Sequence, residues 1–428
     1  MLSPQREDEI IDLINREVIP AIGCTEPIAV ALCTAKATEL LGTRPKKIKA
    51  TLSANIIKNA MGVGIPGTGM IGLPIAIALG ALKGKSMYEL EVLKDVDEES
   101  ISEGKKMIAE NRIAIGQKKG INEKLYIEIE CEGEGERKSK AIISGSHTRF
   151  VYLHDGEKTI EDLRGEQSGD ETEHVCNLDF DTIYKFATET DLDKLRFILD
   201  SAHLNTGAWH ESMNADYGHR LGEVIRKGLG KQIIGESIFA DIVASTAGAC
   251  DARMGGAMVT VMSNSGSGNQ GITATMPVVR YATLTGKSEE ELIRALILSH
   301  LTVIYIKQSL GRLSALCGCV VAGTGSSCGI TYLMGGNYNQ LTYAVKNMIA
   351  NLTGMICDGA KPSCALKVTS GISTAIYSAL MAMEDKTVSS LEGIIDDDVD
   401  RTIANFSRIG VTAMANADEE ILRIMLEK

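Results

Sequence analysis

Aromatic side chains are scarce in this chain of 428 residues: they account for 4% of it, and Trp209 is the single tryptophan. With 43 glycines and 17 methionines present instead, we expect a core built from small and flexible side chains. Basic residues are also in the minority, 44 against 56 acidic residues, which gives a formal net charge of −12. Because nucleic acids and anionic membrane surfaces attract clustered Lys and Arg, this balance argues against both kinds of partner.

No secretory leader is expected either, since residues 1–9 contain Arg6 and three acidic residues but no apolar stretch. We therefore expect a cytoplasmic protein whose ten cysteines stay free thiols in a reducing compartment. Free thiols there are core residues, reactive nucleophiles or metal ligands. The chain also exceeds the usual size of one domain, about 100–150 residues, so at least two modules are expected.

Charge is absent from three long segments, residues 59–82, 254–279 and 313–345. Each is long enough to cross a bilayer, which takes about 20 apolar residues, but glycines, prolines and polar turn residues interrupt them. We expect the walls of a pocket, because glycine lets backbone amides approach a ligand closely. Tightly packed helices with small residues at their crossings are the alternative.

The hydrophobic patterning predicts an α+β fold, with an N-terminal mixed α/β module packed on a larger all-α C-terminal module. The polar stretch 154–179 is the predicted boundary between them. In the first module we expect a helix after Ser3-Pro4, a helix over 25–41 that Gly42 ends, a strand over 47–55, and a hairpin of 125–131 with 141–153. In the second we expect helices over 181–199, 236–247, 288–310, 341–352, 367–383 and 387–426.

Cysteines are concentrated near the C-terminal end, where five lie between positions 317 and 364: Cys317, Cys319, Cys328, Cys357 and Cys364. Clustered thiolates suit zinc or an iron–sulfur cluster. The spacing is not that of a zinc knuckle, because there is no CxxC pair and all seven histidines lie outside this stretch. Cys319 and Cys328 lie in apolar helical sequence, where packing is the favoured role.

Cys24 stands apart from the other cysteines, because it directly precedes the predicted helix over 25–41. The unpaired amides and the positive end of the helix dipole stabilise a thiolate at such a position. A thiol of low pKa there could act as a base, a nucleophile or a metal ligand.

Four segments together resemble the L-cysteine desulfidase family, also called the cysteine-utilisation family, which is related to the iron–sulfur L-serine dehydratases. The segments occur in the same order across nearly the whole chain: Gly23-Cys24-Thr25-Glu26-Pro27, residues 61–69 (MGVGIPGTG), residues 266–271 (GSGNQG) and residues 357–364 (CDGAKPSC). The resemblance implies a serine-dehydratase-beta-like α+β domain over 1–160 and an alpha-like, all-α iron–sulfur domain over 176–428.

The resemblance also implies an oxygen-sensitive [4Fe-4S] cluster held by three cysteines, with one iron open and no pyridoxal phosphate (PLP). Cys317, Cys357 and Cys364 are the implied ligands; Cys319 is the nearest rival to Cys317, and Cys328 is a weaker one. The interval of 40 between the first two resembles that of the related dehydratases, whereas the second, of 7, is shorter. Those dehydratases carry Ser-Ser-His-Thr where this chain has Cys-Thr-Glu-Pro, which leaves Cys24 as the candidate base.

The implied reaction converts L-cysteine and water to pyruvate, ammonia and hydrogen sulfide. The open iron would take the substrate thiolate as a Lewis acid, and Cys24 would remove the Cα proton. If both glycine-rich segments meet the cluster, the substrate site lies between the modules. The expected substrate contacts are Asn55, Asn59, Thr68, Ser265, Asn269 and Gln270, with Lys307 or Lys361 for the carboxylate.

Three other functions remain open at this point. An iron–sulfur L-serine dehydratase would release water instead of sulfide. A cluster-bearing redox sensor would need four protein ligands on a closed cluster, and a glycine-rich binding protein would use its thiols only for packing. The expected partner is a small amino acid substrate, with no nucleic acid and no membrane, and a homodimer is an open alternative.

Overall fold

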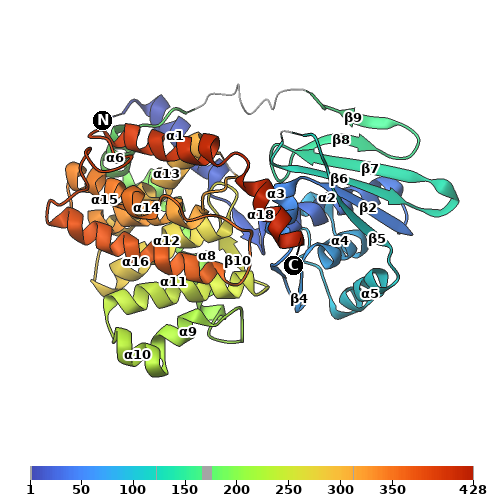
Figure 1. The fold of residues 1–428 in the computed structure, drawn as a ribbon, viewed down its shortest axis with the longest axis horizontal. Coiled ribbons are helices and arrows are strands. Elements are labelled where there is room, and N and C mark those ends of the chain that lie inside the picture. Colours follow the sequence, from blue (N-terminus) through green and yellow to red (C-terminus); the bar gives the residue numbers. More distant parts are fainter. Residues whose placement is uncertain (1, 122, 166–175, 312, 428) are drawn as a thin grey trace.

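The computed structural model describes residues 2–121, 123–165, 176–311 and 313–427. A six-stranded sheet with its helices forms one part of the molecule, and a larger bundle of helices forms the other (Figure 1). The α+β fold class is therefore confirmed. The division of the chain at residues 160–176 stays a prediction, and residues 166–175 of the predicted boundary lie outside the described residues.

The sheet has the strand order β5-β2-β6-β7-β8-β9, in which only β2 and β5 are parallel. Ile127, Ile129 and Cys131 of β6 alternate toward one face and are fully buried, as the period of two of a strand requires. Helices α2 and α4 cover that face. The bounds are β2 (Lys47–Leu52), β5 (Ile113–Gln117), β6 (Tyr126–Glu132), β7 (Lys138–Ser144), β8 (Phe150–His154), β9 (Thr159–Asp162), α2 (Thr25–Leu41), α3 (Ala54–Ala60), α4 (Leu73–Leu82) and α5 (Glu98–Ala109).

Two of the predicted strands differ from the structure at their ends. The strand expected over 47–55 stops at Leu52, because Ser53 is the N-cap of α3. The run expected over 141–153 is two strands, β7 and β8, and the intervening segment includes Gly145 with φ +83°. Gly42 ends α2 as expected, in the left-handed conformation with φ +74°.

In the helical part, α14 (Gly318–Leu333) is the central helix, and α12, α13, α15 and α16 pack around it. Gly325 and Gly329 of α14 allow close crossing, since a Cβ at either position would meet a backbone carbonyl of α13. These small residues explain how the core forms with so few aromatic side chains. The other bounds are α6 (Phe180–Glu189), α7 (Leu192–Leu195), α8 (Leu199–Glu211), α9 (Leu221–Arg226), α10 (Gly228–Ile234), α11 (Ile238–Met254), α12 (Gly268–Leu284), α13 (Glu289–Leu310), α15 (Tyr338–Leu352), α16 (Cys364–Met383) and α17 (Val399–Arg408).

The helical segments expected over 181–199 and 387–426 are wrong as continuous helices. The first is interrupted at Thr190 and restarts where Asp191 caps α7. In the second, helix begins only at α17, which Asp398 caps, and a π-helical turn over Ile409–Ala413 precedes α18 (Ala417–Leu426). Helix α13 matches its prediction and carries a capping box between Ser288 and Glu291.

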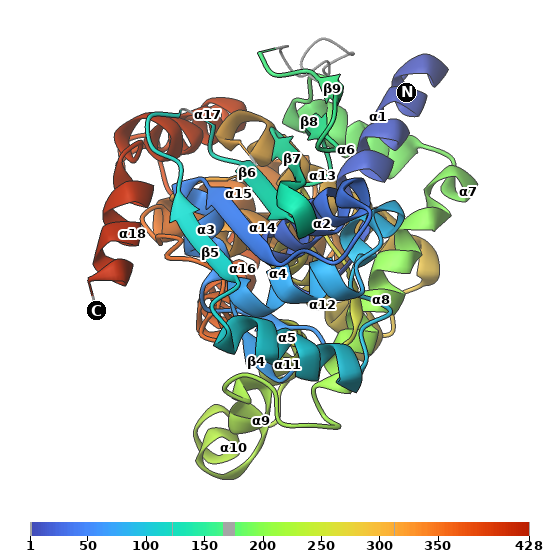
Figure 2. The same ribbon diagram turned by 90° about the vertical axis from the view of Figure 1, so that its right-hand side faces the viewer.

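The N-terminal helix packs on the helical part of the molecule, and the C-terminal helix packs on the part that contains the sheet. Helix α1 (Pro4–Glu17) buries its apolar face in the helical core, whereas α18 packs on α3 beside the sheet (Figure 2). The short strand β1 (Pro20–Ile22) also pairs with β10 (Thr260–Met262) of the helical part. Among the described residues, no helix combines the length and the apolar character needed to cross a bilayer.

Gly64 is a point of direct backbone contact between the two parts. A Cβ at this position would lie 2.6 Å from the carbonyl carbon of Gly255 and 2.6 Å from the amide nitrogen of Gly256. Because both neighbours are backbone atoms, a larger residue cannot be accommodated by a side-chain rotation.

We predict that Gly64→Ala lowers the free energy of unfolding by about 1–3 kcal/mol, the usual cost of forcing an extra carbon into a packed interior. Denaturant titration measures it. Gly116→Ala is the matched control, since Gly116 is exposed in β5 and a Cβ there meets nothing within 4 Å. Equal stability of the two variants would contradict the close approach.

Candidate functional site

The four motifs quoted above contact one another where the two parts of the molecule meet. The Thr25 hydroxyl donates to the Gly266 carbonyl at 2.9 Å. A Cβ on Gly23 would lie 2.5 Å from Cγ of Pro66, and a Cβ on Gly62 would lie 3.5 Å from Cβ of Lys361. The segment before α2, both glycine-rich segments and the cysteine loop therefore form one continuous region.

Cys317 and Cys357 are held side by side by backbone hydrogen bonds. The Cys317 amide donates to Met355 O at 2.9 Å, and the Cys357 amide donates to Ala315 O at 2.7 Å. Cys317 is the N-cap of α14, and Cys364 is the first residue of α16. The three cysteines interact electrostatically with one another, so the structure brings together the three predicted ligands.

Cys317, Cys357 and Cys364, together with Cys319, which bonds to Cys317, form the cysteine group. Their thiols differ in their tendency to ionise. A hydrogen bond from the Cys319 thiol, helped by the charge of Lys367, lowers the pKa of Cys317 despite its burial. Burial raises the pKa of Cys364 to about 11, and it raises the pKa of Cys357 although Lys58 opposes the change. Cys317 is therefore the thiol of the group that ionises most readily.

Two further cysteines clarify which thiols belong to the group. Cys250 lies on α11 and interacts electrostatically with Cys364 and Cys317. Cys328 is fully buried, and its side-chain partner is Thr302 on α13. No contribution to its pKa comes from another cysteine, so Cys328 packs between α13 and α14 apart from the group.

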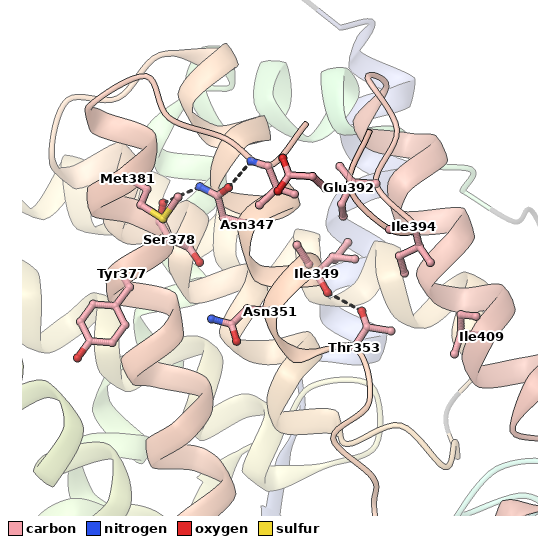
Figure 3. Close-up of a pocket in the computed structure, with 14 residues that line it drawn as sticks. Asn347, Ile349, Asn351, Thr353, Tyr377, Ser378, Met381, Glu392, Ile394 and Ile409 are labelled. Atoms are coloured by element: carbon pink, nitrogen blue, oxygen red, sulfur yellow. Dashed lines mark hydrogen bonds between the residues drawn. The ribbon is translucent and has the colours of Figure 1, made fainter. Parts of the chain in front are cut away.

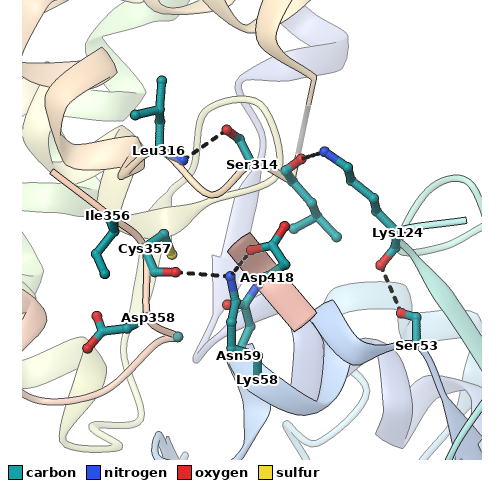
Figure 4. A network of polar contacts seen from close by, with 12 residues as sticks. Ser53, Lys58, Asn59, Lys124, Ser314, Leu316, Ile356, Cys357, Asp358 and Asp418 are labelled. Atoms are coloured by element: carbon teal, nitrogen blue, oxygen red, sulfur yellow. Dashed lines mark hydrogen bonds and ion pairs between the residues drawn. The ribbon is translucent and has the colours of Figure 1, made fainter. Parts of the chain in front are cut away.

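The cysteine loop is fixed from the side of the sheet by Lys58 (Figure 4). Its Nζ donates to Cys357 O at 3.0 Å and to Asp418 Oδ1 at 2.5 Å. The side chains of this ion pair are only 1% and 7% exposed. A Cβ on Gly359 would meet the carbonyl of Lys58, so the loop lies directly on α3, and α18 reaches it through Asp418.

Cys24 is the N-cap of α2, as expected. However, its thiol donates to Glu26 Oε2 at 3.0 Å, and burial followed by the Glu26 charge raises its pKa well above the usual value. Arg253 opposes this shift. The expected low pKa is therefore wrong for this environment, because burial and a neighbouring carboxylate outweigh the helix dipole.

Glu26 is a buried carboxylate that the sequence did not single out. It accepts hydrogen bonds from Asn59 Nδ2 at 3.1 Å and from the Cys24 thiol. The Thr25 hydroxyl, 3.1 Å from Glu26 Oε2, shares its single proton between this oxygen and Gly266 O. The sequence signal that could have identified it is a single glutamate in the first turn of the predicted helix, among neighbours that are apolar or small.

Two of the predicted substrate contacts have buried oxygens for which the described residues offer no hydrogen-bond partner, Asn59 Oδ1 and Gln270 Oε1. Their orientation follows from the other half of each amide, since Asn59 Nδ2 donates to Glu26 and Gln270 Nε2 donates to Asn264 O at 3.4 Å. The Gln270 side chain lies against Gly318, where a Cβ would be 2.9 Å from its Cδ. It therefore lies next to Cys317.

Ser265, on the segment that joins β10 to α12, and Asn269, in the first turn of α12, have partners within the chain. Asn269 Oδ1 accepts a hydrogen bond from Arg253 Nη1 at 3.0 Å, and the Ser265 hydroxyl donates to Asn264 Oδ1 at 2.8 Å. Ser265 also has φ +48°, an unusual conformation for a residue with a side chain. This segment is thus held in one defined conformation.

The remaining predicted contacts lie in other surroundings. The Thr68 hydroxyl bonds within its own turn, to Ile65 O at 2.7 Å. Lys361 forms an ion pair with Asp358 Oδ1 at 2.6 Å. Lys307 is buried in the last turn of α13, and Asn55 lines a cavity described next.

Two of the larger cavities among the described residues lie outside the cysteine group. One of about 1040 Å³ lies between α3, residues 117–121 and 123–124, and α18, and Asn55 and Asp418 both line it. Another of about 710 Å³ lies between α15, α16 and residues 388–395 (Figure 3). The second contains none of the predicted site residues, and Ile349, Ile394 and Ile409 give it an apolar wall.

A fully buried histidine that the sequence did not single out anchors the segment with Ser265. His300 Nδ1 accepts from Asn264 Nδ2 at 3.0 Å, and its Nε2 pairs with the Thr275 hydroxyl at 3.0 Å. Burial lowers the pKa of His300 to about 3. The imidazole is therefore neutral, and it connects α13 to the segment that carries Asn269 and Gln270.

Because His300 is protonated in the unfolded chain below pH 6.5 but not in the folded one, stability must fall as the pH drops below that value. We predict that the free energy of unfolding of the wild type falls more steeply than that of His300→Gln, by about 1.4 kcal/mol per pH unit. Denaturant titrations between pH 7 and pH 5 measure the slopes. His203→Gln, at an exposed position of α8, should keep the wild-type slope; identical slopes for all three proteins would contradict a neutral His300.

The cysteine group is suited to a multinuclear cluster. In the part of the chain that the structure describes, no three His, Cys, Asp or Glu side chains converge as ligands of a single ion. A multinuclear cluster is wider than one ion, so its ligands need not converge on one point. The thiols of Cys317, Cys357 and Cys364 lie at a loop and two helix N-termini, where anionic sulfur is favoured.

The chain is similar to a known protein family and to several bacterial proteins. The family model of the serine dehydratase alpha chain matches residues 87–423. A UPF0597 protein of Bacteroides fragilis is 63% identical over 427 residues, which cover 100% of both chains. UPF0597 proteins of Bacteroides thetaiotaomicron and Porphyromonas gingivalis are 61% and 51% identical over 428 residues, which cover at least 99% of each chain.

Proposed function

This chain belongs to the serine dehydratase alpha-chain family, whose members are iron–sulfur lyases, and from that premise we propose that it is a PLP-independent L-cysteine desulfidase. The observation that carries the proposal is that the segment with Cys24, the two glycine-rich segments and the cysteine loop form one chain of contacts at the junction of the two parts. Location in the cytoplasm and assembly as a homodimer stay predictions.

Cys317, Cys357 and Cys364 would hold a [4Fe-4S] cluster, and their gathering at one place supports this assignment. When bound, such a cluster with three protein ligands supplies an open iron that acts as a Lewis acid on the leaving group. Lys58 and Lys367 lie beside the same thiols. Their positive charges offset the negative charge that thiolates gather in a buried place.

Cys24 is the proposed base for the Cα proton, and Glu26 is the group placed to take the proton of its thiol. The Cys24 thiol donates to Glu26 Oε2, so its proton has an acceptor when the thiolate forms, although burial and the Glu26 charge oppose that ionisation. Arg253 favours the charged form of Cys24. Cys24 Sγ then takes the substrate proton, and Asn59, bonded to the other oxygen of Glu26, keeps the carboxylate oriented.

The choice of cysteine over serine as substrate rests on the Cys24 motif, which departs from that of the serine dehydratases at the position of their histidine. We predict that the anaerobically prepared protein releases sulfide and pyruvate from L-cysteine at least about tenfold faster than it releases pyruvate from L-serine. Parallel assays of both substrates, with ammonia as a common product, measure the ratio. Faster turnover of L-serine would make the chain an L-serine dehydratase and overturn the desulfidase assignment.

The ligand assignment is tested by substituting cysteines one at a time and counting iron per chain. We predict that Cys317→Ser, Cys357→Ser and Cys364→Ser each lose most of the bound iron, because each removes one of three protein ligands. Cys328→Ser is the control, since Cys328 is a buried thiol on α14 that contacts Thr302 instead of the group. It should keep its iron.

Cys319 and Cys250 separate the proposal from a redox sensor. Cys319 lies within the group and Cys250 interacts with two of its thiols, so either could supply the fourth ligand that a closed cluster requires. Loss of iron in Cys319→Ser or Cys250→Ser, together with the three assigned positions, would indicate four protein ligands and contradict an open iron. A colourless, iron-free protein from anaerobic purification would favour a binding protein instead.

A further inference from the structure

Arg253 is a buried cation that has no carboxylate partner. It lies in the last turn of α11 and is 2% exposed. Its Nε donates to Gly23 O at 3.1 Å, and its Nη1 donates to Asn269 Oδ1 at 3.0 Å. Both acceptors are neutral, and among the described residues no Asp or Glu lies within salt-bridge distance of its guanidinium.

A buried charge is normally paired, because removing it from water is costly unless an opposite charge compensates. Arg280 shows the usual arrangement in this molecule, since its Nε binds Asp241 Oδ1 at 2.7 Å. A guanidinium has five donors arranged to hold a carboxylate through two parallel bonds. Two of those of Arg253 are used, and Nη2 has no acceptor among the described residues.

The surroundings of Arg253 are those of the proposed active site. A Cβ on Gly268 would collide with its guanidinium, so Arg253 lies against the first turn of α12. Gly23, which it binds, directly precedes the candidate base Cys24. The unpaired oxygens of Asn59 and Gln270 belong to the same region, because Asn59 binds Glu26 and Gln270 follows Asn269 on α12.

We propose that Arg253 binds the α-carboxylate of the amino acid substrate, while Asn59 Oδ1 and Gln270 Oε1 accept hydrogen bonds from its ammonium group. This inference rests on the proposed function, since it names the recognition groups of that same site. The charges match those of a zwitterion: one unpaired cation, and two unpaired acceptors that carry no net charge. Lys361 is a weaker carboxylate partner, because Asp358 already pairs with it.

Two substrate fragments test the two halves of this recognition separately. 3-Mercaptopropionate keeps the thiol and the carboxylate but lacks the ammonium, and cysteamine keeps the thiol and the ammonium but lacks the carboxylate. Binding of each to the anaerobically prepared protein is measured by titration calorimetry, independently of turnover. In Arg253→Gln we expect 3-mercaptopropionate to bind about 10- to 100-fold more weakly, the usual effect of losing a charged hydrogen-bond partner, and cysteamine to bind as in the wild type.

Asn269→Asp provides the same test without removing the arginine. It places a carboxylate on Arg253 Nη1, so the guanidinium gains an internal counter-ion that competes with the ligand. We expect weaker binding of 3-mercaptopropionate and unchanged binding of cysteamine, whether or not Arg253→Gln folds. Arg280→Gln is the control for loss of a largely buried arginine, and it should leave the binding of both fragments unchanged.

Each result distinguishes the inference from the proposed function. If both variants bind both fragments more weakly, and to the same degree, then Arg253 only offsets the negative charge of Cys24, Glu26 or the cluster. That result would overturn the inference. No binding of 3-mercaptopropionate to the wild type would overturn it as well. Arg253-dependent binding of 3-mercaptopropionate without sulfide release from L-cysteine would leave the inference standing and overturn the desulfidase assignment.

Discussion

Direct contact between backbones, without intervening side chains, is the constraint on which the junction of the two parts depends. Gly64 lies against Gly255 and Gly256, and Gly359 lies against the carbonyl of Lys58. A side chain at either glycine would push the segments apart by the width of at least one carbon. The cysteine loop would then no longer lie against Lys58 and Gly62. The abundance of glycine and the scarcity of aromatic residues thus have the same cause.

This close approach brings several helix N-termini to one place, and the behaviour of each thiol then depends on its immediate neighbour. Cys24 and Cys317 are both N-caps, so the helix dipole acts on both in the same direction. The pKa of Cys24 is nevertheless raised, by burial and Glu26, whereas that of Cys317 is lowered, by Cys319 and Lys367. The same local position therefore holds a thiol that keeps its proton in one case and a thiol that ionises readily in the other.

The sequence predicts those features that depend on local pattern or on the order of motifs. The α+β class, helix α13 with its cap, and the end of α2 at Gly42 follow from such patterns. The choice of Cys317, Cys357 and Cys364 among the five cysteines between positions 317 and 364 came from the resemblance to the desulfidase family, and their role as ligands stays a prediction. Arg253, Cys250 and His300 lie within apolar helices, far along the chain from their partners, so only the packing of α11 and α13 reveals their roles. In the segment 387–426 the local pattern misled the prediction. Successive short amphipathic segments have the same periodicity as one long helix, but the structure divides them into α17, a π-helical turn and α18.

The buried pair of Lys58 and Asp418 links the C-terminal helix to the cysteine loop. Lys58 bonds to Cys357 O and to Asp418 at once, so the position of α18 and that of the loop are held by the same ammonium group. Such pairs add little net stability, because desolvation offsets most of the attraction, but removing one partner leaves an expensive unpaired charge. The pair thus disfavours every arrangement in which α18 leaves α3 while the loop stays in place. The last helix of the chain is in this way part of what positions Cys357.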